Sequence, residues 1–264
     1  MSEKETGKTD MIGKALSLLV LLGDEPRGAS AAELARRSDL PFSTAYRLLG
    51  SLTRDGFVDY EPEGRRYHLG LRVFQLGQRV SNHHGFAGTA RPVLQRVTEG
   101  TGEATILSVR DQHRYLTVNK VDGPQMFRVT SDPGHLGQLH TTAVGKVLVA
   151  FAPEEEREAL LAELELTPLT EHSITDREAF RAEIARVRHQ GFALMDEENE
   201  IGMRAIAVPV LAGHGGVLAA LATAAPVFRM SVDQLQGAVP LLRDAAGELA
   251  ARLPARWAPG RATR

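Results

Sequence analysis

The stretch SAAELARRSDLPFSTAYRLLGSL, residues 30–52, decides the fold of the N-terminal part of the chain. Ser30 and Glu33 have the spacing of a capping box, in which each side chain accepts a hydrogen bond from the other residue's backbone N–H. Asp39, Leu40 and Pro41 interrupt the first helix, and Pro41 suits the start of a second one. The second helix has an apolar stripe at i, i+3, i+4 and i+7, formed by Ala45, Leu48, Leu49 and Leu52. Two short helices joined by a tight turn predict a helix-turn-helix.

The flanking sequence extends this pattern into a small domain. An amphipathic helix comes first, because Ile12, Leu16, Leu19 and Leu22 recur at helical spacing before Gly23. After the stripe, residues 57–60 and 66–69 alternate as strands around the turn at 61–64. We therefore expect a winged helix-turn-helix over residues 10–70, followed by a linking helix over 71–84 whose apolar residues lie on more than one side.

Beyond residue 85 the pattern becomes mixed. Helices are predicted near 87–99, 141–151, 153–163, 176–190 and 231–252, and strands near 103–109, 114–121, 126–131, 192–196, 204–211 and 217–224. So many strands exclude a helical bundle and predict an α+β domain over residues 85–252. The ends, 1–9 and 253–264, are rich in polar residues or in Pro, Gly and Arg, and we expect both to be disordered.

The composition is that of an ordinary soluble protein. The 264 residues are 43% hydrophobic and 24% charged, with a formal net charge of -2 that argues neither for nor against nucleic acid. Residues 27–80 carry nine Arg against six Asp or Glu, a modest local excess of positive charge. The absence of cysteine excludes disulfides and thiolate metal sites. Because no apolar run approaches about 18 residues, we expect no membrane span and a cytoplasmic protein.

The helix over 41–54 has a polar face opposite its apolar stripe. This face carries Ser43, Arg47, Gly50 and Arg54, with Thr44 and Tyr46 beside it. An arginine can meet two acceptors on guanine, and hydroxyl groups can meet bases or phosphates. Arg65 and Arg66 at the hairpin tip are placed to contact phosphates as a wing would. Taken alone, the pattern also fits solvated positions on a small helical domain.

Several motifs resemble the isocitrate lyase regulator (IclR) family in the family's own order. In the N-terminal part they are residues 11–19, 32–49, 56–58 and 67–70; in the C-terminal part they are 139–148, 174–176, 187–192, 196–210 and 225–226. The likeness covers about residues 11–250. It implies a winged helix-turn-helix, a linking helix, a GAF-like domain that senses a small molecule, and homodimers or homotetramers that bind double-stranded operator DNA.

The resemblance also implies an effector pocket, and here the chain departs from relatives that bind small oxoacids. Positions that hold polar side chains in those relatives are Met195, Ala205, Ala222 and Ala224 here, and Met126, Ala143, Val144 and Gly145 are expected beside them. An apolar pocket leaves the oxygens of a small acid unpaired, at about 1–3 kcal/mol for each group. We therefore expect an effector that is bulkier and more apolar than glyoxylate or pyruvate, such as an aromatic or hydrophobic acid. Backbone amides at the helix start near Ala143 could hold its carboxylate. The alternative is that the alanines pack the pocket shut and that no effector binds.

Three other motifs are set aside. Gly145-Lys146 lacks the rest of a phosphate loop, because His140 and Val147 occupy the positions that need Gly and Ser or Thr. The histidines at 83, 84, 135 and 140 are better explained as surface or packing residues than as metal ligands. Residues 196–198 are interpreted as a solvated turn rather than as paired catalytic carboxylates. We therefore predict no cofactor, no metal and no enzyme activity, with a metabolite-processing enzyme or a protein-interaction module as the rival classes.

Overall fold

The computed structural model describes residues 10–86, 88–126, 130–213 and 216–253. The chain divides into two compact units, Met1–Val80 and Ser81–Arg264. The ends predicted to be disordered, 1–9 and 254–264, lie outside the described residues. Leu253 was predicted to open the disordered tail, which is wrong, because it follows the last helix and is buried in the core of the second unit.

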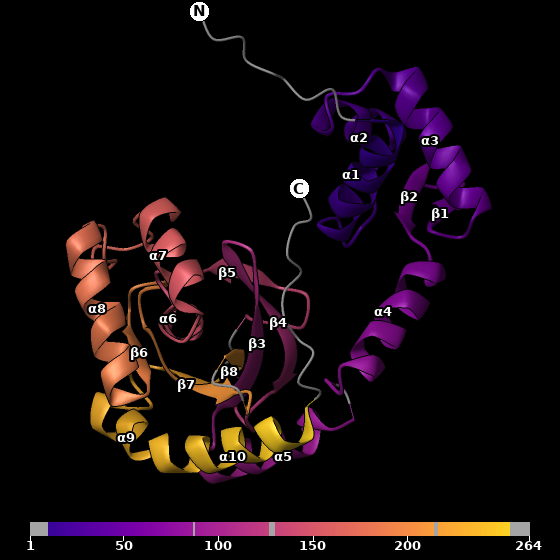
Figure 1. Cartoon of the computed structure of the whole chain (residues 1–264). Helices are drawn as coiled ribbons and strands as arrows, with labels where there is room; N and C mark the ends of the chain where they lie inside the picture. Colours follow the sequence, from indigo (N-terminus) through magenta and orange to yellow (C-terminus); the bar gives the residue numbers. More distant parts are fainter. Residues whose placement is uncertain (1–9, 87, 127–129, 214–215, 254–264) are drawn as a thin grey trace, which may run out of the picture. The chain divides into compact units, whose positions relative to one another are not determined.

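The N-terminal unit is a winged helix-turn-helix, as predicted (Figure 1). Its elements are α1 (Met11–Gly23), α2 (Ala31–Arg37), α3 (Phe42–Arg54), β1 (Val58–Glu61), β2 (Arg66–Leu69) and α4 (Leu71–His83), which runs across the boundary between the units. The predicted capping box at the start of α2 is present, with Ser30 N donating to Glu33 Oε2 at 2.8 Å. Ala45, Leu48 and Leu49 of the α3 stripe are buried and Leu52 is half-buried. The helix packs against α1, α2 and β1, and its leucines share a core with Leu18, Leu34 and Val58.

The C-terminal unit is built on one antiparallel sheet of order β5-β4-β3-β8-β7-β6. The strands are β3 (Ala104–Asp111), β4 (Arg114–Val121), β5 (Leu136–Gln138), β6 (Ala193–Asp196), β7 (Met203–Leu211) and β8 (Val217–Pro226). Figure 1 shows helices on both faces of this sheet, which confirms the expected α+β class.

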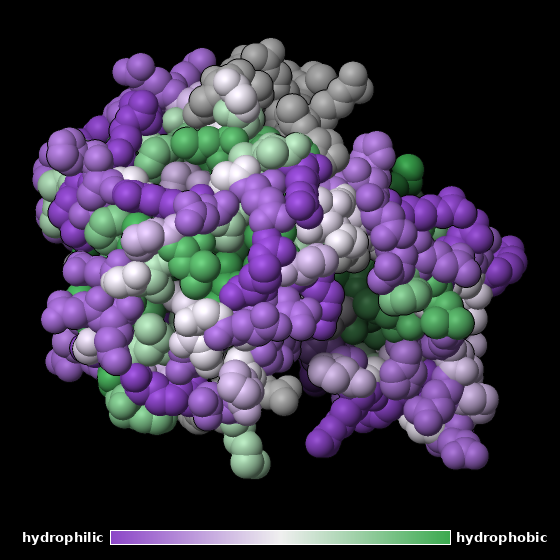
Figure 2. All heavy atoms as spheres, turned by 90° about the horizontal axis from the view of Figure 1, so that it is seen from below, coloured by the Kyte–Doolittle hydropathy of each residue, from purple (hydrophilic) through white to green (hydrophobic). Residues whose placement is uncertain are grey.

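The two faces of the sheet bury separate apolar clusters. One face packs α6 (Ala143–Ala150), α7 (Glu154–Glu163) and α8 (Arg177–Gln190); the other packs α5 (Ala90–Thr101), α9 (Val232–Gly237) and α10 (Val239–Arg252). Seen from below in Figure 2, the face that carries α5 and α10 is largely hydrophilic, with hydrophobic side chains between the polar ones. In the described part of the chain, no helix is long and apolar enough to cross a membrane.

Two predicted elements differ from the structure. The helix expected over 231–252 is divided at Ala238, because Pro240 has no N–H for the preceding turn and instead occupies the first turn of α10. The strand expected over 126–131 is not formed at residues 126, 130 and 131, and residues 127–129 lie outside the described residues. The sheet edge is instead β5, where Gly137 makes room for the ring of Tyr115 on the neighbouring strand.

Candidate functional site

The exposed side of α3 carries the residues that the sequence places on it. Ser43, Tyr46 and Arg47 are exposed, and Thr44 is half-buried at the edge of the apolar stripe. The stripe fixes this arrangement, because Ala45, Leu48 and Leu49 must face the core. The polar groups are therefore presented together along one side of the helix.

Three arginines on α3 and at the tip of the wing, Arg47, Arg54 and Arg65, have no acidic partner among the described residues. Arg47 donates to the sulfur of Met11 at 3.7 Å, and Arg54 donates to Ser51 Oγ at 3.4 Å. Arg65 lies at the hairpin tip with φ at 51° and is exposed. Within the described residues none of the three forms an ion pair, so their charge is free to meet an anion.

Arg66 is placed differently from its neighbour Arg65. It donates to the carbonyl oxygen of Gly28 at 2.7 Å, and its guanidinium lies 3.9 Å from Glu33. Arg66 was predicted to contact phosphates together with Arg65, and its hydrogen bond to Gly28 also ties it to the loop before α2. Its first role in the structure is to fix the wing to the helical part of the unit.

The second candidate site is a cavity of about 130 Å³ between α6 and the sheet of the C-terminal unit. Its floor is a hollow of small side chains on neighbouring strands. Met195, Ala205 and Ala224 lie in one cross-strand row, and Ala222 and Ile106 pair in the next row. Ala143 and Val144, in the first turn of α6, lie over this floor. Because these floor residues are alanines, space remains between the sheet and α6 that larger side chains would fill.

Other lining residues are polar and were missed by the sequence reasoning. Tyr115 and Ser131 are buried in the wall, while Thr130, His135 and Glu200 lie at its exposed edge. Burial raises the pKa of the Tyr115 phenol, and a hydrogen bond with Ser131 partly offsets the shift. Tyr115 lies on the predicted strand β4. Thr130, Ser131 and His135 come from the segment before β5, and Glu200 comes from the turn after β6; these two segments carry no helical or strand periodicity that would have placed them in the wall.

Two predicted pocket residues do not line the cavity. Met126, on the connection after β4, is 99% exposed. Gly145 is buried under the segment before α6, where an added Cβ would lie 2.2 Å from the carbonyl oxygen of Leu139. Gly145 thus permits a close backbone approach, and its N–H is already bonded to the Thr142 hydroxyl at 3.1 Å.

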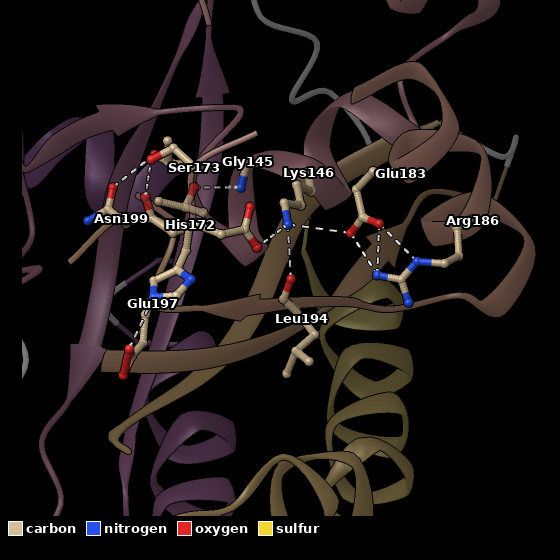
Figure 3. A network of polar contacts seen from close by, with 12 residues as sticks. Gly145, Lys146, His172, Ser173, Glu183, Arg186, Leu194, Glu197 and Asn199 are labelled. Carbon is tan, nitrogen blue, oxygen red and sulfur yellow. Dashed lines mark hydrogen bonds and ion pairs between the residues drawn. The ribbon is translucent and has the colours of Figure 1, made fainter. Parts of the chain in front are cut away.

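A buried ion pair joins α6 to the turn that completes the cavity (Figure 3). Lys146 is 1% exposed, and its Nζ lies 2.5 Å from Glu198 Oε1, 3.1 Å from the carbonyl oxygen of Leu194 and 3.4 Å from Glu183 Oε1. Glu183 also holds Arg186 at 2.8 Å. The ammonium therefore links α6, β6, α8 and the turn over 197–202.

The same turn is fixed by hydroxyl groups from two other segments. Thr170 and Ser173 each donate to the carbonyl oxygen of Glu198, at 3.3 and 2.7 Å, and Thr141 donates to Asn199 Oδ1 at 3.0 Å. Asn199 and its neighbour Glu200 line the cavity. The network thus sets the position of two pocket residues.

Glu198 corrects the prediction of a solvated turn, because it is only 9% exposed. Burial raises the pKa of its carboxyl group more than the attraction of Lys146 lowers it. Its second oxygen, Oε2, has no hydrogen-bond partner among the described residues. The pair is therefore costly to bury, and each charge depends on the other.

The described residues contain no candidate metal site. Among these residues no group of three or more His, Asp or Glu side chains could hold a metal ion. His140, one of the four histidines considered, is buried beside Phe180 and contacts the carbonyl oxygen of Thr167 at 3.0 Å.

An exposed basic helix and wing in one unit, with a ligand-sized cavity in the other, define a DNA-binding regulator that carries an effector-binding domain. Family models agree over both units: the IclR helix-turn-helix domain matches residues 12–62, and the bacterial transcriptional regulator IclR C-terminal domain matches residues 78–251. The chain belongs to the IclR family of transcriptional regulators.

Relatives with known names and structures support this assignment. The HTH-type transcriptional regulator KdgR of Escherichia coli is 32% identical over 251 residues, which cover 95% of each chain. A regulator of the same name from Dickeya chrysanthemi is 32% identical over 92% of this chain and 80% of its own. An IclR homologue from Microbacterium hydrocarbonoxydans, solved in complex with 4-hydroxybenzoate, has a TM-score of 0.82 and 26% identity, covering 92% of this chain and 98% of its own. The chain is thus a transcription regulator of this family.

The buried ion pair leads to a prediction about stability. Lys146→Met leaves the Glu198 carboxylate buried without its cation, and we expect the free energy of unfolding to fall by about 3–5 kcal/mol. Glu183 keeps Arg186, so the loss arises at Glu198. Adding Glu198→Gln to Lys146→Met should recover at least half of the loss, because the unpaired charge is removed. Urea unfolding of the full chain measures both changes.

Arg181→Met is the matched control for this cycle, because its ion pair with Glu158 is on the surface. It should leave the unfolding midpoint nearly unchanged. Equal stability of Lys146→Met and the wild type would show that the ion pair does not hold the turn.

Proposed function

We propose that α3 enters the major groove of operator DNA, with Ser43, Thr44, Tyr46 and Arg47 at the bases and nearby phosphates. The observation that carries this proposal is the set of exposed arginines on α3 and the wing without acidic partners. An unpaired guanidinium beside the N-terminal half of a recognition helix suits guanine or phosphate. Arg65 and Arg66 contact the phosphate backbone, and Arg66 also holds the wing in place.

Two copies of the chain bind together, because one winged domain contacts too few base pairs for a specific site. Helix α4 supplies part of the contact between them. This helix is fully described, and none of its residues is buried. Four of its large apolar side chains are between 44% and 74% exposed: Leu71, Phe74, Leu76 and Val80. Large apolar side chains at such exposure favour an interface.

The cavity over the sheet binds an aromatic or similarly apolar acid. Its volume is close to the roughly 150 Å³ of a cavity that accepts benzene in another protein. The open space favours a ligand over the alternative that the alanines close the pocket. The related structure that contains 4-hydroxybenzoate supports the same class of ligand.

The polar edge of the cavity can receive the acid's oxygens while the ring covers the alanine floor. The first backbone N–H groups of α6, at Ala143 and Val144, lie beside the floor. The next N–H, that of Gly145, already donates to the hydroxyl of Thr142. A carboxylate there would be favoured by the start of the helix. Glyoxylate or pyruvate would leave the apolar floor uncovered.

The DNA assignment predicts different effects for the two exposed arginines. Arg47→Ala should weaken binding to the specific operator by about 1–3 kcal/mol, because one base contact is lost. Arg65→Ala should weaken binding to all duplexes more evenly and reduce the salt dependence, since a phosphate contact is lost. Fluorescence anisotropy with operator and scrambled duplexes at several salt concentrations distinguishes these outcomes. Unchanged operator affinity of folded Arg47→Ala protein would refute the placement of α3.

The assembly proposal predicts that charge on α4 separates the copies. Leu76 and Val80 lie on one side of the helix, so Leu76→Glu with Val80→Glu places two carboxylates in the contact. Light scattering should then report monomers, or a smaller oligomer than the wild type. Gln75→Glu with Gln78→Glu adds the same charge at polar positions of α4 and serves as the control. A Leu76→Glu, Val80→Glu protein that retains the assembly of the wild type would place the interface elsewhere.

The effector assignment predicts which acids bind. Calorimetry should detect binding of benzoate or 4-hydroxybenzoate to the full chain. It should detect no binding of glyoxylate or pyruvate. Ala222→Leu fills the floor and should weaken aromatic-acid binding at least tenfold, whereas Ala251→Leu, on the exposed side of α10, should not. Millimolar or tighter binding of glyoxylate with no response to aromatic acids would contradict the proposal.

A further inference from the structure

Two aromatic side chains are exposed along one flank of α3. Phe42 is the first residue of the helix, and Tyr46 lies one turn later. They are 56% and 58% exposed, and their rings stack with centroids 6.0 Å apart and planes at 23°. The stack is therefore a small, ordered apolar surface facing away from the core of the unit.

This surface adjoins the polar face of α3. Ser43 follows Phe42 and Arg47 follows Tyr46, so the stack and the polar groups lie side by side along the same two turns. The buried stripe of Ala45, Leu48 and Leu49 excludes the stack from the interior. A molecule that lies along these two turns of the helix therefore can contact both Arg47 and the aromatic rings.

The chemistry of the major groove limits what these rings can recognise. Hydrogen-bond donors and acceptors occupy most of each base edge, and the apolar group presented there is the 5-methyl of thymine. Phe42 has no side-chain donor or acceptor, so it cannot distinguish bases by hydrogen bonds. Tyr46 has one hydroxyl at the far end of its ring, which leaves the ring itself as apolar surface.

We propose that the Phe42–Tyr46 stack recognises thymine through its 5-methyl group, beside the base that Arg47 contacts. This inference rests on the proposed placement of α3 in the major groove. It assigns two classes of contact to one helix: hydrogen bonds from the arginine and apolar contact from the stacked rings. Each operator half-site therefore contains at least one thymine at a fixed distance from the position contacted by Arg47.

The test uses the full chain and deoxyuridine, which removes the thymine methyl and keeps every hydrogen-bonding group. An operator is first selected from a random duplex library, and the thymines of its half-sites are then replaced by deoxyuridine. Anisotropy should show wild-type affinity falling about fourfold for each methyl in contact. The variant Phe42→Ala with Tyr46→Ala should bind the two duplexes equally, and its own selection should lose the thymine preference.

Phe228→Ala is the matched control, because Phe228 is 75% exposed but belongs to the C-terminal unit. It should keep the full sensitivity to deoxyuridine. Equal wild-type affinity for both duplexes would overturn the inference, whatever the folding of the double variant. If Arg47→Ala still loses operator binding in that case, the proposed function stands and only the role of the stack is wrong. If Arg47→Ala also binds normally, the placement of α3 itself fails.

Discussion

The ion pair between Lys146 and Glu198 is the interaction on which the C-terminal unit most depends. Every residue of α6 is buried, and Lys146 is the helix's one charged residue. Its ammonium can be tolerated inside only because Glu198, Glu183 and the carbonyl oxygen of Leu194 surround it. Since Glu198 belongs to the turn that lines the cavity, the same contact fixes both the helix over the floor and part of the wall.

The N-terminal unit obeys a simpler constraint. The apolar stripe of α3 must be buried for the three helices and the hairpin to form a core. Once it is buried, the opposite side of the helix has to face solvent, together with Arg47 and the stacked aromatic rings. The core thus orients the residues that we assign to DNA without contacting the DNA itself.

Much of this could be predicted from sequence where short-range patterns decide structure. The capping box at Ser30, the stripe of α3 and the alternating strands of the wing depend on neighbours within a few positions. The alanines on β7 and β8 were also placed in the pocket by resemblance, and the structure brings Ala205, Ala222 and Ala224 together at the floor.

Features set by long-range packing could not be predicted. The burial of Glu198 depends on Lys146, 52 positions away, and nothing in the local run of acidic residues distinguishes it from a solvated turn. Arg66 is fixed by a carbonyl oxygen 38 positions away. The exposed position of Met126 and the polar wall around Ser131 follow from the path of irregular segments, which have no periodicity to interpret.

We propose that occupation of the apolar cavity changes the affinity of the protein for operator DNA. The most direct measurement is nuclease footprinting of the full chain on its selected operator, with and without saturating 4-hydroxybenzoate. We predict that the protein concentration for half protection changes at least about fivefold with the acid, as expected for a coupling free energy near 1 kcal/mol or more. The change should vanish in Ala222→Leu. Identical protection curves for the wild type with and without an acid that calorimetry has shown to bind would contradict the claim.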